Sequence, residues 1–257
     1  PAFCRALLLR AGITLSTCQE ALTLQQRDAR WHAIDEQGQT IADAAVAIIC
    51  SAGDSQRFTQ TAHLPLKTIR GQITRLRANA QSQALRSVLC GDGYVSPARG
   101  EEHFLGASFR FDRSDTEPSV EENASNLALL SSLSPEFEEA LAGDGQLDPA
   151  ILRARAALRC TTPDYLPLIG PVVQAEQFRE DYAALAKDAS KRPDTPSTWH
   201  TGLYINAAHG SRGLISCPLS GEIIAALLEN EPMPLPSDLM KAVHPNRFLL
   251  RQLIRGT

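Results

Sequence analysis

The sequence predicts an α+β fold, in which an antiparallel-sheet domain is inserted between two parts of an α/β domain. Three observations support this prediction. Residues 44–50 form an uninterrupted apolar run, typical of a strand buried on both faces of a parallel sheet. From residue 67 onward, short alternating segments are typical of antiparallel strands. Residues 201–228 then return to the pattern of a strand, a glycine turn and a helix.

Composition narrows the class of protein. The chain has 257 residues, of which 43% are hydrophobic and 21% are charged, as in soluble globular proteins. No apolar run is long enough to cross a bilayer and no secretion signal is visible, so we expect a cytoplasmic protein without a membrane partner. The six cysteines contain no C-x-x-C pair, so we predict no metal site and expect most of them to be small core residues.

Charge is distributed unevenly along the chain. The net charge is −4, which excludes a global polycation. Between Asp54 and Asp92, however, there is no acidic residue, and residues 240–257 are also free of acids. The bases of these two zones are Arg57, Lys67, Arg70, Arg75, Arg77 and Arg86, then Lys241, Arg247, Arg251 and Arg255. Such zones can hold a phosphate backbone, although an ordinary solvated surface is the alternative.

The first region is predicted to contain one helix followed by short strands. We expect a helix at residues 3–9, strands at residues 13–15 and 21–24, and a hairpin at residues 31–41 around the Gln37-Gly38 turn. The apolar run at residues 44–50 ends in a sharp turn at residues 51–54. Ligands of α/β sheets commonly lie beyond the carboxyl ends of strands, so this turn is a candidate contact.

The second region is predicted to contain an antiparallel sheet with helices. We expect strands at residues 68–76, 87–89, 94–95 and 103–109, and helices at residues 120–133 and 135–141. Ser119 is a plausible N-cap of the first helix. Asp148-Pro149 predicts another helix start, because a capping side chain precedes a proline. Residues 245–255 predict a short helix with arginines four residues apart on one face. We expect the chain to be divided into four segments, which are residues 1–66, 67–157, 158–236 and 237–257.

The turn at residues 209–214 is the strongest candidate for a cofactor contact. Gly210 and Gly213 permit backbone torsions and close approaches that a Cβ atom would prevent. The backbone N–H groups at the start of the following helix favour negative charge. A reduced flavin carries negative charge along its N1–C2=O edge, so the segment suggests a flavin. A plain helix-entry turn is the alternative.

Three segments, taken in order, resemble the FAD-dependent D-amino-acid-oxidase-like family, which includes glycine oxidase and sarcosine oxidase. They are residues 44–54, residues 65–72 (PLKTIRGQ), and residues 158–170 (LRCTTPDYLPLIG) together with residues 209–228. The resemblance implies an FAD/NAD(P)-binding α/β domain, an antiparallel-sheet substrate domain and FAD as cofactor. The chain has no G-x-G-x-x-G after a strand. The resemblance therefore implies a fragment that lacks the first βαβ unit of the FAD domain.

A closer resemblance exists to the C-terminal oxidoreductase part of bacterial bifunctional tRNA-modifying enzymes. It rests on residues 70–72 (RGQ), 90–97 (CGDGYVSP), 105–109 (LGASF), 162–171 (TPDYLPLIGP), 209–213 (HGSRG) and 244–248 (HPNRF). It implies removal of the carboxymethyl group from 5-carboxymethylaminomethyl-2-thiouridine at the tRNA wobble position, which gives the 5-aminomethyl form. It also implies tRNA as a partner, and an N-terminal methyltransferase domain in the full-length protein.

The resemblance also implies site residues. Arg159 matches the carboxylate-binding arginine of glycine oxidase, because it lies three residues before Thr162, and a guanidinium can grip a carboxylate through two parallel hydrogen bonds. Its alternative is a structural salt bridge or a surface arginine. Arg70 is a second catalytic candidate, with a fold-holding ion pair as an equal alternative. The predicted cofactor contacts are Ala21, Ala52, Gly53, Gly71, Gln72, His209, Gly210, Ser211, Arg212, Gly213 and Leu214. Tyr94 and Tyr204 are candidate pocket walls, with core packing as the alternative.

Two other functions stay open at this point. One is a small-amine oxidase of the glycine or sarcosine type, whose activity would not depend on the basic zones. The other is a non-catalytic fragment that binds RNA or a partner domain and holds no flavin. Neutralising the basic residues would separate the first from a tRNA-processing enzyme, and a visible absorption spectrum would identify the second.

Overall fold

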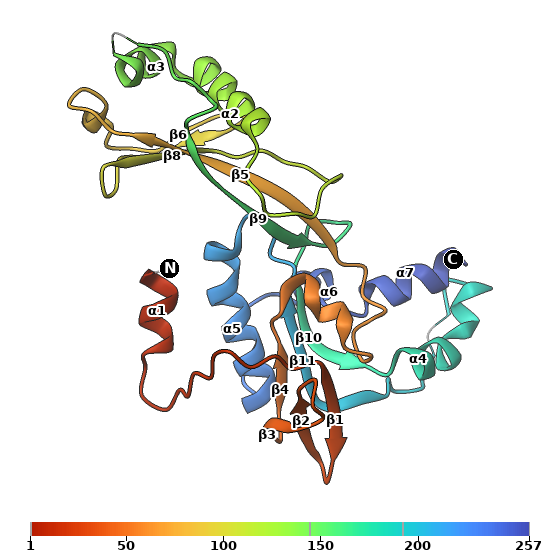
Figure 1. The fold of residues 1–257 in the computed structure, drawn as a ribbon. Helices are drawn as coiled ribbons and strands as arrows, with labels where there is room; N and C mark the ends of the chain where they lie inside the picture. Colours follow the sequence, from red (N-terminus) through yellow and green to blue (C-terminus); the bar gives the residue numbers. More distant parts are fainter. Residues whose placement is uncertain (1, 144, 192, 257) are drawn as a thin grey trace. The chain divides into compact units, whose positions relative to one another are not determined.

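The computed structural model describes residues 2–143, 145–191 and 193–256 of the chain. These residues form two compact units (Figure 1). Unit 1 comprises the described residues of Pro1–Pro65, Leu168–Ala207 and Cys217–Thr257, and unit 2 comprises those of Leu66–Pro167 and Ala208–Ser216. Unit 2 is therefore inserted into unit 1 along the sequence, as predicted. No helix of the described parts is long and apolar enough to cross a membrane.

The main sheet of unit 1 has the strand order β10-β11-β4. Its strands are β4 (Ala47–Ile49), β10 (Leu168–Val173) and β11 (Trp199–Ala207). β11 runs antiparallel to β10 and parallel to β4, so the parallel pairing expected for residues 44–50 is confirmed. The expected burial on both faces is wrong, because Ile48 is 43% exposed. Among the described strands β4 pairs with β11 alone, and it covers three residues, which leaves this side chain open to solvent.

A second sheet of unit 1 is a three-stranded meander. It consists of β1 (Thr23–Arg27), β2 (Arg30–Ile34) and β3 (Thr40–Ala44). The predicted hairpin is β2–β3, and its turn contains Gly38 with a φ of +76°. The indole N–H of the buried Trp31 donates to the Thr201 carbonyl at 2.9 Å, which ties this sheet to β11. The strand predicted at residues 13–15 is absent, since these residues have no ladder partner among the described strands.

Helices complete unit 1. They are α1 (Ala2–Leu8), η1 (Ala52–Arg57), α4 (Ala175–Asp181), η3 (Ala183–Ala186), α5 (Gly213–Glu229, with residues 213–216 in unit 2), α6 (Ser237–Val243) and α7 (Arg247–Arg255). The predicted helices at residues 3–9 and 245–255 are confirmed. Arg247 is buried, however, and its guanidinium donates to the Val243 and His244 carbonyls and lies 4.3 Å from the Phe248 ring centroid. One of the three tail arginines therefore holds the fold together.

Unit 2 contains a five-stranded antiparallel sheet in the order β6-β7-β8-β5-β9. The strands are β5 (Lys67–Arg77), β6 (Leu89–Cys90), β7 (Tyr94–Val95), β8 (Glu102–Gly106) and β9 (Arg153–Thr161), and the short helix η2 (Ser82–Ala84) follows β5. β5 and β9 pair over nine residues, from Lys67↔Thr161 to Arg75↔Arg153. This long ladder fixes which side chains of the two strands share a face.

Two helices of unit 2, α2 (Val120–Leu133) and α3 (Pro135–Ala142), lie on one side of the sheet (Figure 1). The bounds of α2 are as predicted, and the Ser119 side chain accepts a hydrogen bond from the Glu122 amide as its N-cap. The apolar part of the contact consists of Leu76, Val95, Leu105, Leu127, Leu130 and Leu141.

A buried polar cluster lies between β5 and α2. Asn123 accepts hydrogen bonds from Gln72 at 3.0 Å and from Thr74 at 2.8 Å, and all three side chains are buried. Asn126 donates to the Thr74 hydroxyl at 3.0 Å. Because buried polar groups are costly without partners, this cluster specifies the position of α2 on the sheet.

Two further predictions, one for residues 148–149 and one for the cysteines, are wrong. No helix starts at Asp148-Pro149; the Asp148 carboxylate accepts the Ala150 amide at 2.9 Å in a turn, and the chain enters β9 because pairing with β5 overrides the local capping signal. The cysteines are not mostly core residues either, since Cys160 is buried and the other five are exposed.

Candidate functional site

Arg159 and Gly71 lie together on neighbouring strands of unit 2. Ile69 is the register partner of Arg159, and Gly71 lies two residues further along β5. A Cβ atom at position 71 would overlap the guanidinium group of Arg159. The missing side chain of Gly71 therefore provides the space in which the half-buried Arg159 side chain lies. We predicted Gly71 as a cofactor contact, and its observed neighbour is this arginine.

The guanidinium group of Arg159 has few partners within the protein. Its Nη1 atom donates to the Ser108 carbonyl at 3.4 Å, and its Cζ atom lies 5.9 Å from the Phe109 ring centroid. Across the described residues, no carboxylate forms a salt bridge with it. The salt-bridge alternative therefore finds no support here. A half-buried guanidinium with donors to spare can bind a carboxylate strongly, because water competes less there than at the open surface.

Arg70 has a different environment on the opposite face of β5. Its fully buried guanidinium forms an ion pair with Glu122, and it donates to the backbone carbonyls of Asp115, at 2.9 Å, and Glu117. Glu122 also accepts the Ser108 hydroxyl at 2.5 Å. The structure therefore favours the fold-holding alternative for Arg70.

The side chain of Gln72 is also engaged in the fold. Its amide nitrogen donates to the Ser119 carbonyl at 2.7 Å, and its amide oxygen accepts the Ser119 N–H at 2.8 Å. The residue is fully buried beneath α2. Its backbone is occupied as well, since the Gln72 backbone amide donates to the Ser108 hydroxyl at 2.8 Å and its carbonyl accepts the Ser108 amide at 3.1 Å.

The turn at residues 208–214 is attached to the end of β9. The Gly210 amide donates to the Cys160 carbonyl at 2.8 Å, and Ala208 and Gly210 have φ values of +64° and +57°. The amides of residues 215 and 216 donate to the Arg212 carbonyl, each at 3.0 Å. The amides of Gly213 and Leu214 precede these bonds, and an α-helix offers no internal acceptor to its first amides. They form a partly positive seat that fits the negative edge of a reduced flavin ring.

His209 stabilises this turn. Its Nδ1 atom lies 2.8 Å from the Ser216 hydroxyl, and burial lowers its pKa below the ordinary value, so the ring is neutral at pH 7. This contact agrees with a turn-stabilising role rather than that of a base. Ser211 and Arg212 are exposed, and the Leu214 side chain is 77% exposed. The structure thus brings residues 209–214 next to the strand that carries Arg159.

The remaining predicted residues belong to unit 1, except Tyr94. Ala52, with a φ of +51°, begins η1 in unit 1, and Gly53 follows it. Ala21 is half-buried just before β1. Tyr204 packs against the apolar cluster of Ile169, Ile223 and Ile224, which favours its core-packing alternative. Tyr94 is half-buried in β7 of unit 2. The cofactor contacts of Ala21, Ala52 and Gly53 stay predictions.

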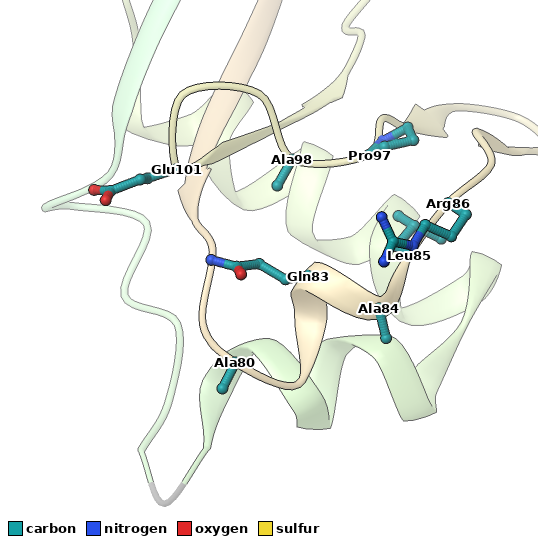
Figure 2. Close-up of a pocket in the computed structure, with 8 residues that line it drawn as sticks. All are labelled: Ala80, Gln83, Ala84, Leu85, Arg86, Pro97, Ala98 and Glu101. Carbon is teal, nitrogen blue, oxygen red and sulfur yellow. The ribbon is translucent and has the colours of Figure 1, made fainter.

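Two surface hollows contain none of these residues. One hollow in unit 2 has a volume of about 650 Å³. Figure 2 shows Arg86 and Glu101 on opposite sides of the residues that line it. Its lining is Ala80, Gln83, Ala84, Leu85, Arg86, Pro97, Ala98 and Glu101, which includes none of the predicted site residues. A hollow of about 700 Å³ in unit 1 contains His63 and His200 beside Arg179 and Glu176. Neither hollow brings together a nucleophile and a base.

Sequence reasoning missed Ser108 and Phe109, which contact the Arg159 side chain. Both belong to the LGASF motif at residues 105–109, which served only as evidence for the family resemblance. The segment pairs with β5 beyond the end of β8, since the Ser108 amide donates to the Gln72 carbonyl at 3.1 Å. The motif was therefore a usable signal for position, although not for contact with Arg159.

The chain is similar over its whole length to known proteins. The chain is 55% identical over 258 residues to the tRNA 5-methylaminomethyl-2-thiouridine biosynthesis bifunctional protein MnmC of Ectopseudomonas mendocina, covering 100% of this chain and 39% of that protein. It is 54% identical over 257 residues to the protein of the same name from Chromobacterium violaceum, covering 99% and 38%. The chain thus spans well under half the length of these relatives.

Solved structures share the fold. Glycine oxidase from Geobacillus kaustophilus superposes with a TM-score of 0.66 at 19% identity, covering 92% of this chain and 54% of that chain. Iminodiacetate oxidase from Chelativorans sp. BNC1 superposes with a TM-score of 0.62 at 17% identity, covering 91% and 54%. The predicted α+β fold is confirmed by these likenesses. The family model described as FAD dependent oxidoreductase (DAO) matches residues 1–227, and the chain therefore belongs to that family.

Proposed function

We propose that this chain is the FAD-dependent oxidoreductase part of a bifunctional enzyme that removes the carboxymethyl group from 5-carboxymethylaminomethyl-2-thiouridine at the tRNA wobble position. The name of relatives with 54–55% identity across the chain supports this substrate. The observation that carries the proposal is the Arg159 guanidinium, which has no carboxylate partner in the described structure and lies on the strand that anchors the turn at residues 209–214. The proposal includes tRNA and an N-terminal methyltransferase domain as partners, and a cytoplasmic location.

The reaction breaks a C–H bond in the carboxymethyl group. When bound, FAD supplies the hydride acceptor for the carbon next to the substrate nitrogen. Arg159 binds the acid end of the carboxymethyl group through paired N–H donors, which fixes the orientation of that C–H bond. Loss of the hydride leaves an imine, which water hydrolyses to the 5-aminomethyl uridine and glyoxylate. The amides of Gly213 and Leu214 stabilise negative charge that develops beside them.

The experiment compares Arg159→Leu with the unchanged full-length protein on tRNA that carries the carboxymethyl nucleoside. We expect kcat/KM to fall about 100-fold or more, because two charge-assisted hydrogen bonds are lost. The readout is the nucleoside composition of digested tRNA by mass spectrometry. Arg179→Leu, which removes an exposed arginine paired one turn away with Glu176, serves as the matched control. Unchanged turnover in Arg159→Leu, or oxidation of free glycine but not of the modified tRNA, would refute the proposal.

A further inference from the structure

The face of the unit 2 sheet that points away from α2 carries a row of arginines. The register pairs Arg75 with Arg153 and Ile73 with Arg155, so these side chains project from the same face as that of Arg159. Arg77 lies two residues beyond Arg75 and shares this face. The intervening residues of β5, Gln72, Thr74 and Leu76, are buried on the opposite face beneath α2. We define Arg75, Arg77, Arg153, Arg155 and Arg159 as the arginine face.

Positive charge exceeds negative charge on this surface. Glu102 forms ion pairs with Arg75 and, at 3.5 Å, with Arg153. Arg77 and Arg155 are exposed, and neither has a carboxylate partner within the residues that the structure describes. A hollow of about 500 Å³ is lined by Arg75, Arg77 and Arg153 together with Glu101 and Glu102. Five guanidinium groups and two carboxylates thus leave a net positive surface, hollowed beside Arg75, Arg77 and Arg153, that attracts an anionic chain.

Two exposed aromatic rings adjoin the Arg159 end of this face. Phe109 and Phe111 are 51% and 59% exposed, and their ring centroids lie 5.1 Å apart in an edge-to-face arrangement. Arg110 lies between them in the sequence and forms a backbone β-bridge with Arg70, whose side chain lies on the α2 side of the sheet. The two rings therefore project with Arg159 on the opposite side. Only 5% of the chain is aromatic, so two exposed neighbouring phenylalanines need an explanation.

We propose that the arginine face, with Phe109 and Phe111, binds an unpaired RNA loop. The arginines hold successive phosphates, and the phenylalanine rings stack on an unpaired base near Arg159. This proposal rests on the proposed function and deepens it, since it states how the RNA around the modified uridine is held. It favours single-stranded RNA over a duplex, because a duplex leaves no free base to stack on the rings.

The test measures binding of a fluorescently labelled RNA hairpin with an unpaired loop, by anisotropy over a series of salt concentrations. For Arg153→Gln/Arg155→Gln we expect about tenfold weaker binding. The slope of log K against log salt should become shallower by about 1.4, because each phosphate contact on a single strand contributes about 0.7. For Phe109→Leu/Phe111→Leu we expect about tenfold weaker binding with an unchanged slope, because stacking releases no counterions.

Controls separate this surface from general charge effects. Arg30→Gln/Arg179→Gln removes two exposed, paired arginines of unit 1 and should leave the affinity and the slope unchanged. Circular dichroism shows whether each variant is folded. A fully paired RNA duplex of equal length should bind more weakly than the hairpin and should be insensitive to the phenylalanine changes.

Distinct outcomes overturn this inference and the proposed function. The inference fails if the arginine-face variant and the phenylalanine variant, both folded, bind the hairpin as the unchanged protein does. It also fails if the unit 1 control loses as much affinity, or if duplex RNA binds as tightly as the hairpin. These readouts require no catalysis. The proposed function fails separately if the unchanged protein binds the hairpin but does not convert the carboxymethyl nucleoside in tRNA.

Discussion

The cores of the two units differ in chemistry. Unit 1 packs its main sheet with aliphatic side chains, and Leu168, Leu203 and Ile205 are fully buried. Unit 2 adds to its leucine cluster a set of buried polar and charged side chains between β5 and α2, which includes Arg70 and Glu122. An apolar core loses stability in proportion to the cavity that a substitution leaves, whereas a polar core loses it when one partner is left unpaired. Substitutions in the two cores should therefore destabilise the two units for different reasons.

The largest expected effect is the loss of one partner in the polar core. Glu122→Leu removes the buried counter-charge of Arg70 and leaves only the exposed Asp115 carboxylate, 3.5 Å from its Nε atom, so we expect the free energy of unfolding of unit 2 to fall by about 3–5 kcal/mol. Cys160 is buried in unit 2, so its rate of thiol labelling reports on opening of that unit. Glu121→Leu, at the neighbouring exposed position, is the control. A change below about 1 kcal/mol in Glu122→Leu would remove the contrast between the cores.

A cavity in the apolar core should have a somewhat smaller effect. Ile223 is fully buried in unit 1, and we expect Ile223→Ala to lower the free energy of unfolding by about 2–5 kcal/mol. Both tryptophans, Trp31 and Trp199, belong to unit 1, so tryptophan fluorescence during urea unfolding follows this unit alone. Leu228→Ala, at a partly exposed position of α5, should change the midpoint little. Equal losses in both variants would contradict the assignment of Ile223 to the core.

An added methyl group at Gly71, on the face of β5 that points away from α2, should affect substrate binding more than stability. Gly71→Ala displaces the Arg159 guanidinium, and weakening one charge-assisted hydrogen bond by about 1.5–3 kcal/mol lowers kcat/KM roughly tenfold to a hundredfold. Turnover of the carboxymethyl nucleoside measures the effect. Gly221→Ala adds the same methyl group where no atom lies within 4 Å and should leave turnover unchanged. Full activity in Gly71→Ala would show that Arg159 does not need its observed position.

The smallest expected effect is a loss of stability of unit 1 as the pH falls. Burial lowers the pKa of His63 and of His244 to about 4, from 6.5, and nearby arginines add to this shift. Both folded-state values lie below the unfolded value, so the unfolded chain binds more protons between pH 6.5 and pH 4 and stability falls as the pH falls. From pH 7 to pH 5.5 we expect a loss of about 1 kcal/mol for each histidine. Tryptophan fluorescence measures it, and a His63→Gln variant with an unchanged pH dependence would contradict this cause.

Capping and turn residues correctly predicted the elements whose bounds depend on neighbouring residues in the sequence. Ser119 and the acidic residues that follow it marked the start of α2, and the Gln37-Gly38 turn marked the hairpin β2–β3. The predictions at Asp148-Pro149 and for burial of Ile48 were wrong because strand pairing and sheet position decided those cases. Strand pairing and the position of a strand in its sheet depend on residues far away in the sequence, so the residues next to Asp148 and Ile48 do not reveal them.

The candidate site was predictable in part. Family resemblance identified Arg159 and the turn at residues 209–214, but the fit of Arg159 over Gly71 depends on the register of two strands far apart in the sequence. Runs of basic residues were a poor guide to free charge, because Arg57 pairs with Glu20 at 2.6 Å and Arg70 is buried against Glu122. The arginine face instead combines β5 with β9, which the sequence separates by the whole of α2 and α3.

The vacancy above Gly71 also links two positions for evolution and for engineering. A larger residue at position 71 would force the flexible end of the Arg159 side chain out of its observed place, so we expect the two positions to vary together among relatives. The paired exchange Gly71→Ala with Arg159→Ser would avoid this overlap, remove the anion-binding group and leave additional space beside β5. Such a protein would be a starting point for accepting amines that carry a neutral substituent in place of the carboxylate.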